Sequence, residues 1–221
     1  SVIDASGASG GGTLLVGGDS RGSNPDVPNA SVVAVGPGAE IKADALENGD
    51  GGKVVVWGTD AASFRGRISA KGGAEGGNGG HVEVSGRRLD FQGLVDLTVP
   101  KGLMGNLLLD PFNMTISHLP QTDVFPCGCG NDLIDLGIAE GSNIQDTFLV
   151  EQLASANVTV ESGLGGSASG GDITIVGGAN AANLTWTNAN GTDPDATGKL
   201  ILNASNNIYV EAGAVVRAAG H

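Results

Sequence analysis

Residues 77–86 read GNGGHVEVSG, in which a glycine pair is followed by alternating apolar and polar residues. Alternation with a period of two is typical of a β-strand with one buried face. It predicts that Val82 and Val84 enter a core. The residues that face water are then His81, Glu83 and Ser85. On this interpretation Glu83 is a solvated strand residue and not a catalytic carboxylate, and the glycines form a tight corner that needs positive φ.

The same unit recurs along the chain. Copies with a glycine pair are GGTLLV (11–16), GGKVVV (51–56) and GGDITI (170–175), and copies with one glycine are GNLLLD (105–110) and GKLILN (198–203). The unit returns after 28 residues from Gly51 to Gly79, and after 26 from Gly79 to Gly105. Internal repetition at such a period indicates a solenoid, in which short strands stack in parallel about 4.8 Å apart.

The pattern therefore predicts an all-β fold, a parallel β-helix (β-solenoid) of roughly nine or ten coils. The expected corner glycines are Gly51, Gly52, Gly79 and Gly80, and the expected core residues are Val54, Val56, Val82, Val84, Leu107 and Leu109. Antiparallel hairpins stay open as an alternative, because the hairpin dipeptide Asn-Gly occurs at 48–49, 78–79 and 190–191.

Composition narrows the function classes. The net charge is −13 with only 11 Lys and Arg, so binding of nucleic acid through its phosphates is not expected. No apolar run is long enough to span a membrane as a helix. The chain starts in a strand-like pattern without a signal peptide, and we expect it to be a piece of a longer protein.

The repeat is interrupted near residues 117–146, which contain two prolines and both cysteines and are expected to form an irregular insertion. Cys127 and Cys129 are candidates for a small, strained disulfide, with reduced thiols as the alternative. A zinc site would need further Cys or His ligands nearby, and the three histidines are scattered, so we expect no metal and no cofactor.

The chain is predicted to form one continuous solenoid domain in three parts: coils in 1–116, the insertion in 117–156 and further coils in 157–221. Helical periodicity is found only in DTFLVEQLASA (146–156), with Asp146 as a candidate N-cap, and a short helix and an irregular segment are equally acceptable there.

The sequence contains no specific motif for a nucleotide, calcium or catalytic site. GNGGHVEV lacks the Gly-Lys-Ser/Thr of a phosphate loop, and histidine replaces the aspartate of the calcium-binding nonapeptide. Six Asn-x-Ser/Thr sequons are weak glycosylation candidates, because such residues are common in turns: Asn29, Asn113, Asn157, Asn183, Asn190 and Asn203. We expect the few arginines near Glu83 and Asp90 to form local ion pairs, so no enzyme is predicted.

Residues 24–117 resemble the repeat region of filamentous haemagglutinin-like exoproteins, which are large bacterial surface adhesins of two-partner secretion systems. The matching motifs are GDGGKVVVW (49–57), FRGRISAKGG (64–73), GGNGGHVEVSG (76–86) and LLLDPFNMTI (107–116). The sequence departs from the family pattern at Met114, where the family often has Ile, and at the cysteine-bearing insertion.

The resemblance implies a right-handed β-helical shaft that is secreted to the cell surface of a Gram-negative-type bacterium through an outer-membrane transporter partner. Implied roles are adhesion, aggregation or biofilm formation, with a host or neighbouring-cell surface, glycans or copies of the chain itself as partners. Two alternatives stay open: a self-assembling extracellular filament subunit with end-to-end stacking, and a glycan-binding or carbohydrate-active β-helix module.

Overall fold

The computed structural model describes residues 1–120, 142–163, 171–187 and 198–219, and over these ranges the chain is mostly β-strand. Every strand pair in the described part is parallel. Antiparallel hairpins are therefore absent there, and the Asn-Gly pairs at 48–49 and 78–79 do not mark hairpin turns. The pair at 190–191 lies outside the described residues.

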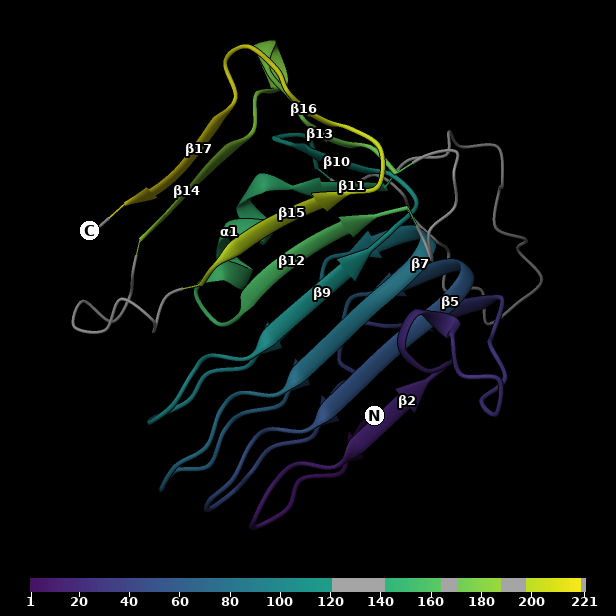
Figure 1. The fold of residues 1–221 in the computed structure, drawn as a ribbon, viewed down its shortest axis with the longest axis vertical. Coiled ribbons are helices and arrows are strands. Elements are labelled where there is room, and N and C mark those ends of the chain that lie inside the picture. The colour runs from purple at the N-terminus through teal and green to yellow at the C-terminus, as the bar shows by residue number, and fades with distance from the viewer. Residues whose placement is uncertain (121–141, 164–170, 188–197, 220–221) are drawn as a thin grey trace.

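Three sheets carry most of the chain (Figure 1). The first contains, in spatial order, β1 (Val2–Asp4), β4 (Glu40–Lys42), β6 (Arg67–Ser69) and β8 (Leu94–Asp96). The second contains β2 (Thr13–Val16), β5 (Lys53–Phe64), β7 (His81–Phe91), β9 (Asn106–Asp110), β12 (Asn157–Ser162) and β15 (Leu200–Ala204). In Figure 1 these six strands lie side by side in that order, from purple to yellow.

The third sheet contains β11 (Ser142–Gln145), β10 (Met114–Ser117), β13 (Ile173–Ile175) and β16 (Ile208–Val210). The far halves of the two long strands extend towards it: β3 (Val32–Val35) pairs with residues 61–64 of β5, which pair in turn with residues 88–91 of β7. Leu89 N–H of β7 donates to Ser142 Oγ of β11 over 2.8 Å, so β11 continues this face. A fourth pair consists of β14 (Asn183–Thr187) and β17 (Val215–Ala219).

The chain passes through the first, second and third faces in succession, as in β4, the first half of β5 and its second half, and then begins again with β6. The second sheet has six strands along its path, so the described residues make fewer passes than the nine or ten expected. The reason is that some passes are long: on β9, Asn106 pairs with His81 of the pass before it, but its partner in the next strand of the sheet is Asn157.

One segment enters the stack out of order. β10 follows β9 in sequence, but β11 lies between β10 and β7 on the third face. The helix α1 (Asp146–Leu153) follows β11 directly and takes a strand's place on the first face. On one side Gln152 Oε1 accepts from Val95 N of β8 over 2.9 Å, and on the other Asp146 Oδ2 accepts from Asn183 N of β14 over 2.8 Å.

The insertion is thus only partly irregular, because residues 142–153 form β11 and α1. Gln145, and not Asp146, is the N-cap, and its side chain makes no capping hydrogen bond. The buried Asp146 carboxylate instead accepts from Thr147 N over 2.7 Å in the first turn, where a negative charge is favourable. Cys127 and Cys129 lie outside the described residues.

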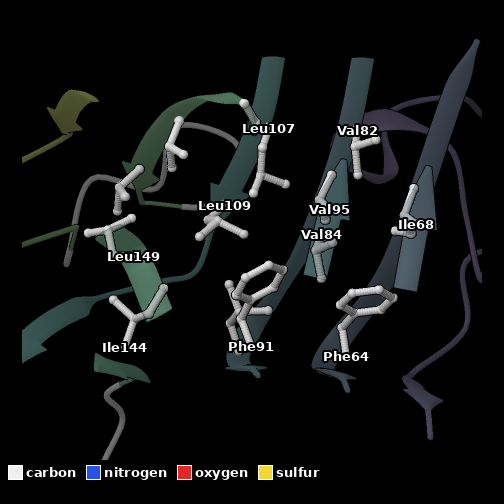
Figure 2. Close-up of a cluster of buried hydrophobic side chains, with 14 of the residues drawn as sticks. Phe64, Ile68, Val82, Val84, Phe91, Val95, Leu107, Leu109, Ile144 and Leu149 are labelled. Carbon is white, nitrogen blue, oxygen red and sulfur yellow. The ribbon is translucent and has the colours of Figure 1, made fainter. Parts of the chain in front are cut away.

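In the core, aliphatic side chains of register-paired residues stack in columns, and one pair of phenylalanine rings stacks among them. The six predicted core residues are all fully buried: Val54, Val56, Val82, Val84, Leu107 and Leu109. Figure 2 shows side chains of β5 to β9, β11 and α1 that point toward one another. Phe64 and Phe91 are register partners whose ring centroids lie 5.7 Å apart in a stacked arrangement. One hydrophobic cluster extends from Val33 to Leu184.

The corner glycines are needed for a reason other than the one expected. None of Gly51, Gly52, Gly79 and Gly80 has a positive φ. A Cβ on Gly79 would instead lie 2.1 Å from the carbonyl oxygen of Leu97, and one on Gly52 would lie 2.0 Å from that of Gly12. Close approach of the neighbouring backbone, not backbone conformation, therefore excludes a side chain at these corners.

Candidate functional site

On the outer face of the second sheet, acidic and other polar side chains lie among apolar ones in register rows. One row contains Val55, Glu83 and Leu108, and the next contains Trp57, Ser85, Asp110 and Glu161. These residues alternate with the core valines and leucines, so they point away from the core. The sequence correctly predicts this direction for Glu83 and Ser85, but the prediction that they face water is wrong, because both are buried.

A loop between β2 and β3 packs on part of these rows, where it contacts Trp57, Glu83 and Glu161. We call residues 17–31 the strap. Its base is closed by the hydrogen bond from Ala30 N to Gly17 O at 2.6 Å. Its tip contains a 3-10 turn, Ser20–Gly22, that is capped by the Asp19 carboxylate. In Figure 1 the strap is the purple loop that follows β2, beside β5.

Trp57 lies under the strap. A Cβ on Gly18 would lie 2.6 Å from Trp57 Cδ1, and one on Gly22 would lie 2.7 Å from Trp57 Cε2, so only glycine allows the strap to lie this close to the indole. At the edge of the same contact Lys53 Nζ donates to Asp19 Oδ1 over 2.7 Å. That bond is the largest of the causes that hold the pKa of Asp19 well below its usual range.

Arg21 connects the strap to the carboxylates beneath it. Its backbone N–H donates to Glu83 Oε1 over 2.9 Å, and its guanidinium pairs with Glu161 Oε2 of β12. Arg21 has a φ of 54°, and it is the one non-glycine residue of the described chain with positive φ. A left-handed conformation costs about 1 kcal/mol for a non-glycine residue. The contacts with Glu83 and Glu161 must therefore compensate for this strain.

Asp110 is a buried carboxyl group next to two other acids. Burial, followed by the negative charges of Glu161 and Glu83, raises the pKa of Asp110 to about 7, against an opposing effect of Arg21. Desolvation lowers the pKa of His81, which lies near Glu83 on the same strand. Near neutral pH the cluster thus contains one cation, Arg21, and more carboxyl groups than that cation can balance.

Two buried polar atoms in the same row have no hydrogen-bond partner: Trp57 Nε1 and Ser85 Oγ. The two residues are register partners, and Trp57 lies against the strap. An unpaired buried donor costs about 1 to 3 kcal/mol. The strained backbone of Arg21 and these two unpaired atoms both lower the stability of the closed strap.

A groove of about 820 Å³ crosses the outer face of the first sheet and reaches α1. It is lined by both signs of charge, and neighbours pair inside it: Lys42 Nζ lies 3.0 Å from Glu40 Oε2, and Lys71 Nζ lies 2.8 Å from Asp96 Oδ2. The Asp44 carboxylate accepts from Lys71 N over 2.7 Å. Five acidic and three basic residues line the groove, so it is polar with a small excess of negative charge.

The predicted local ion pair is present on the third face. Asp90, whose side chain is fully buried, accepts from Arg65 Nε over 2.9 Å, from Arg65 Nη2 over 2.7 Å and from Ser63 Oγ over 2.9 Å. Arg87 lies over the ring of Phe112, 4.8 Å from its centroid. These contacts hold neighbouring strands together and bring no second acid close to Asp90.

The sequon asparagines serve in turns and between strands. Asn157 Nδ2 donates to Met104 O over 2.8 Å, and Asn29 Nδ2 donates to Gly22 O over 2.9 Å within the strap. Asn203 Nδ2 donates to Glu161 Oε1, Asn113 Oδ1 accepts from Gly171 N, and Asn183 Oδ1 accepts from Thr185 Oγ1. Asn190 lies outside the described residues.

Sequence reasoning missed the strap and its partners Trp57, Asp110 and Glu161. A signal was present: when the repeat units are aligned, Glu83 and Asp110 fall on adjacent outward positions. The described residues contain no group of three or more His, Cys, Asp or Glu side chains arranged to hold a metal ion. No described helix is long and apolar enough to cross a bilayer. The chain matches no protein-family model, and no curated protein shows significant similarity to it.

Proposed function

We propose that this chain is a rigid segment of a right-handed parallel β-helix, and that it forms part of the shaft of a secreted bacterial surface protein. In this role it acts through length and rigidity in adhesion, aggregation or biofilm formation, without catalysis. The motifs in residues 24–117 that resemble filamentous haemagglutinin-like exoproteins support this proposal, and so does the succession of parallel strands through three faces.

One observation carries the proposal: core-facing residues are uncovered at both ends of the stack. Ile3 is 48% exposed although its register partner Ile41 is buried. Val216 is 47% exposed although its partner Leu184 is fully buried. Apolar columns that continue to an open strand edge are completed by another coil of the same kind, because open edges bind further strands.

The test is electron microscopy of the protein as secreted by its native source, with a small label inserted at the exposed turn around Gly36. This turn suits an insertion because a side chain on Gly36 or Gly38 would meet no atom within 4 Å. We expect labels along the length of thin, uniform rods. Labels confined to globular heads, or particles without rods, would contradict a shaft.

The same images test self-assembly by end-to-end stacking, which the two uncovered ends also favour. Continuous fibres that exceed the length of one chain would mean that copies of the chain complete each other's open edges. In that case Val216→Lys should shorten the fibres strongly, because a lysine on the last apolar column would be buried at each junction. Lysine at Leu46, which is exposed away from both ends, is the matched control.

The groove on the first sheet favours a second candidate, a glycan-binding module. Paired acids and bases in a hollow on an outer face suit a polar, uncharged ligand such as an oligosaccharide. Binding of the isolated chain to an array of glycans tests this candidate, and Asp44→Ala should weaken any binding tenfold or more. If the array shows no binding, or the variant binds equally well, the groove is not the site.

A further inference from the structure

The closed strap carries costs in free energy: Arg21 has a left-handed backbone, and Nε1 of Trp57, on which the strap packs, has no hydrogen-bond partner. Its tip rests on the carboxylates through Arg21, which reaches Glu83 through its N–H and Glu161 through its guanidinium. Trp57 lies beneath the strap, and its Nε1 and the Oγ of its register partner Ser85 are buried without a hydrogen-bond partner. Backbone strain and unpaired buried polar atoms lower the free energy needed to open such a segment locally.

We propose that the strap is a pH-sensitive cover: in mildly acidic solution it lies closed over Trp57, Ser85 and Asp110, and it releases them as the solution becomes alkaline. The proposal concerns an event in the folded protein and is independent of the shaft function. It stands on the contacts of Arg21 with Glu83 of β7 and with Glu161 of β12, which bridge the intervening strand β9, where Asp110 lies.

In the described ranges, charged groups face the Arg21 tip from the strap and from the second sheet. The strap contributes Arg21 and Asp19, and Asp19 is paired with Lys53 of β5. The sheet contributes His81 and Glu83 from β7, Asp110 from β9 and Glu161 from β12. Because its pKa is lowered, the His81 ring is neutral at the pH where Asp110 ionises. Arg21 is then the cation that stabilises the ionised Asp110 carboxylate.

The sign of the effect follows from linkage. The pKa of Asp110 is raised to about 7 by burial in the closed state, whereas an opened strap lets water reach the carboxyl group and returns the pKa toward its ordinary value of 3.8. Closure therefore takes up a proton between these two values. The strap is most stable in acid, and its closing equilibrium weakens about tenfold per pH unit until Asp110 ionises in the closed state as well.

Hydrogen exchange of the Arg21 amide on the intact chain tests the proposal, because this N–H is protected only by its bond to Glu83. With intrinsic exchange rates corrected for pH, its protection factor should fall about 30-fold between about pH 5.5 and pH 8.5. In Asp110→Asn, which cannot ionise, the protection factor should be equal at both pH values. Glu47→Gln, an exposed carboxylate elsewhere, should behave as the parent chain.

A second measurement tests the proposal even if Asp110→Asn does not fold. Trp57 fluorescence in a Trp186→Phe background reports whether the strap covers the indole. Quenching by acrylamide should increase from about pH 5.5 to pH 8.5, while amides of the core strand β10 keep their protection. Arg21→Ala should raise quenching at both pH values. Protection of Arg21 and quenching of Trp57 that do not change with pH would overturn the proposal, and so would equal changes in β10, which would mean global unfolding.

Discussion

A Cβ atom on Gly79 would lie 2.1 Å from the carbonyl oxygen of Leu97 and 2.4 Å from Gly105 N. Gly79 N–H donates to Leu103 O over 2.9 Å, and Gly105 N–H donates to Leu97 O over 3.1 Å. The corner is thus a place where the backbones of successive passes touch through hydrogen bonds. A side chain at position 79 must push these passes apart or break the bonds between them.

We therefore expect Gly79→Ala to lower the free energy of unfolding by ~3 kcal/mol or more, because a rigid backbone and not a flexible side chain blocks the new methyl group. Urea denaturation measures the change. Gly36→Ala is the matched control, since the new Cβ there meets no atom within 4 Å, and it should change stability by less than about 0.5 kcal/mol. Equal effects would mean that close packing is not what selects glycine at the corner.

Val84→Asp tests the inward direction of the core column. Val84 is fully buried between its register partners Val56 and Leu109, so a carboxylate there has no polar partner. We expect a loss of ~4 kcal/mol or more in unfolding free energy. Val32→Asp, at an exposed position of β3, should cost less than ~1 kcal/mol. A melting temperature that is unchanged in Val84→Asp would contradict the assignment of Val84 to the core.

Asp90 tests the buried ion pair of the third face. In Asp90→Ala the guanidinium of Arg65 and the buried hydroxyl of Ser63 both lose their acceptor, so we expect a loss of ~2 to 4 kcal/mol in unfolding free energy. Glu40→Ala removes an exposed ion pair with Lys42 and should change stability far less than Asp90→Ala does. If the two variants lose the same stability, the Arg65 pair is worth no more than a surface pair.

The sequence predicts those features that depend on residues close together in the chain. The alternation of polar and apolar residues is enough to place Val82 and Val84 in the core and to direct Glu83 outward. What it does not predict is set by distant parts of the chain. Burial of Glu83 depends on a strap whose glycines, asparagines and prolines have no apolar period. The helix α1 occupies a strand position only because β8 and β14 offer it hydrogen-bond partners on both sides.

The neighbouring positions of Asp110 and Glu161 depend on strand register, and for this reason the sequence does not predict them. Asp110 and Glu161 lie in one row only because β9 pairs with β12, and residues 111–156 separate these strands in sequence. A count of repeat units cannot place a partner across so long an interruption. For the corner glycines, the sequence predicts the right residues but the wrong cause. The cause is a close contact with the backbone of another pass, and the local sequence does not reveal such a contact.

Asp110→Asn should change the pH dependence of global stability. The pKa of Asp110 is raised from 3.8 to about 7 in the folded chain, so the stability of the parent is full below the ordinary value and falls as pH rises through 7. Asparagine does not ionise, so the variant lacks this loss. We expect the stability of the variant relative to the parent to increase by up to ~4 kcal/mol from about pH 4 to pH 8.

Opening of the strap makes this difference smaller, because it lets Asp110 ionise in water without unfolding of the sheets. A difference near the full value therefore means that the strap stays closed until the chain unfolds, and a difference of ~1 to 2 kcal/mol means that the strap opens first. Urea denaturation at several pH values measures it, with Glu47→Gln as the control that should follow the parent at each pH. Parallel curves for the parent and Asp110→Asn would show that Asp110 is solvated in the folded chain.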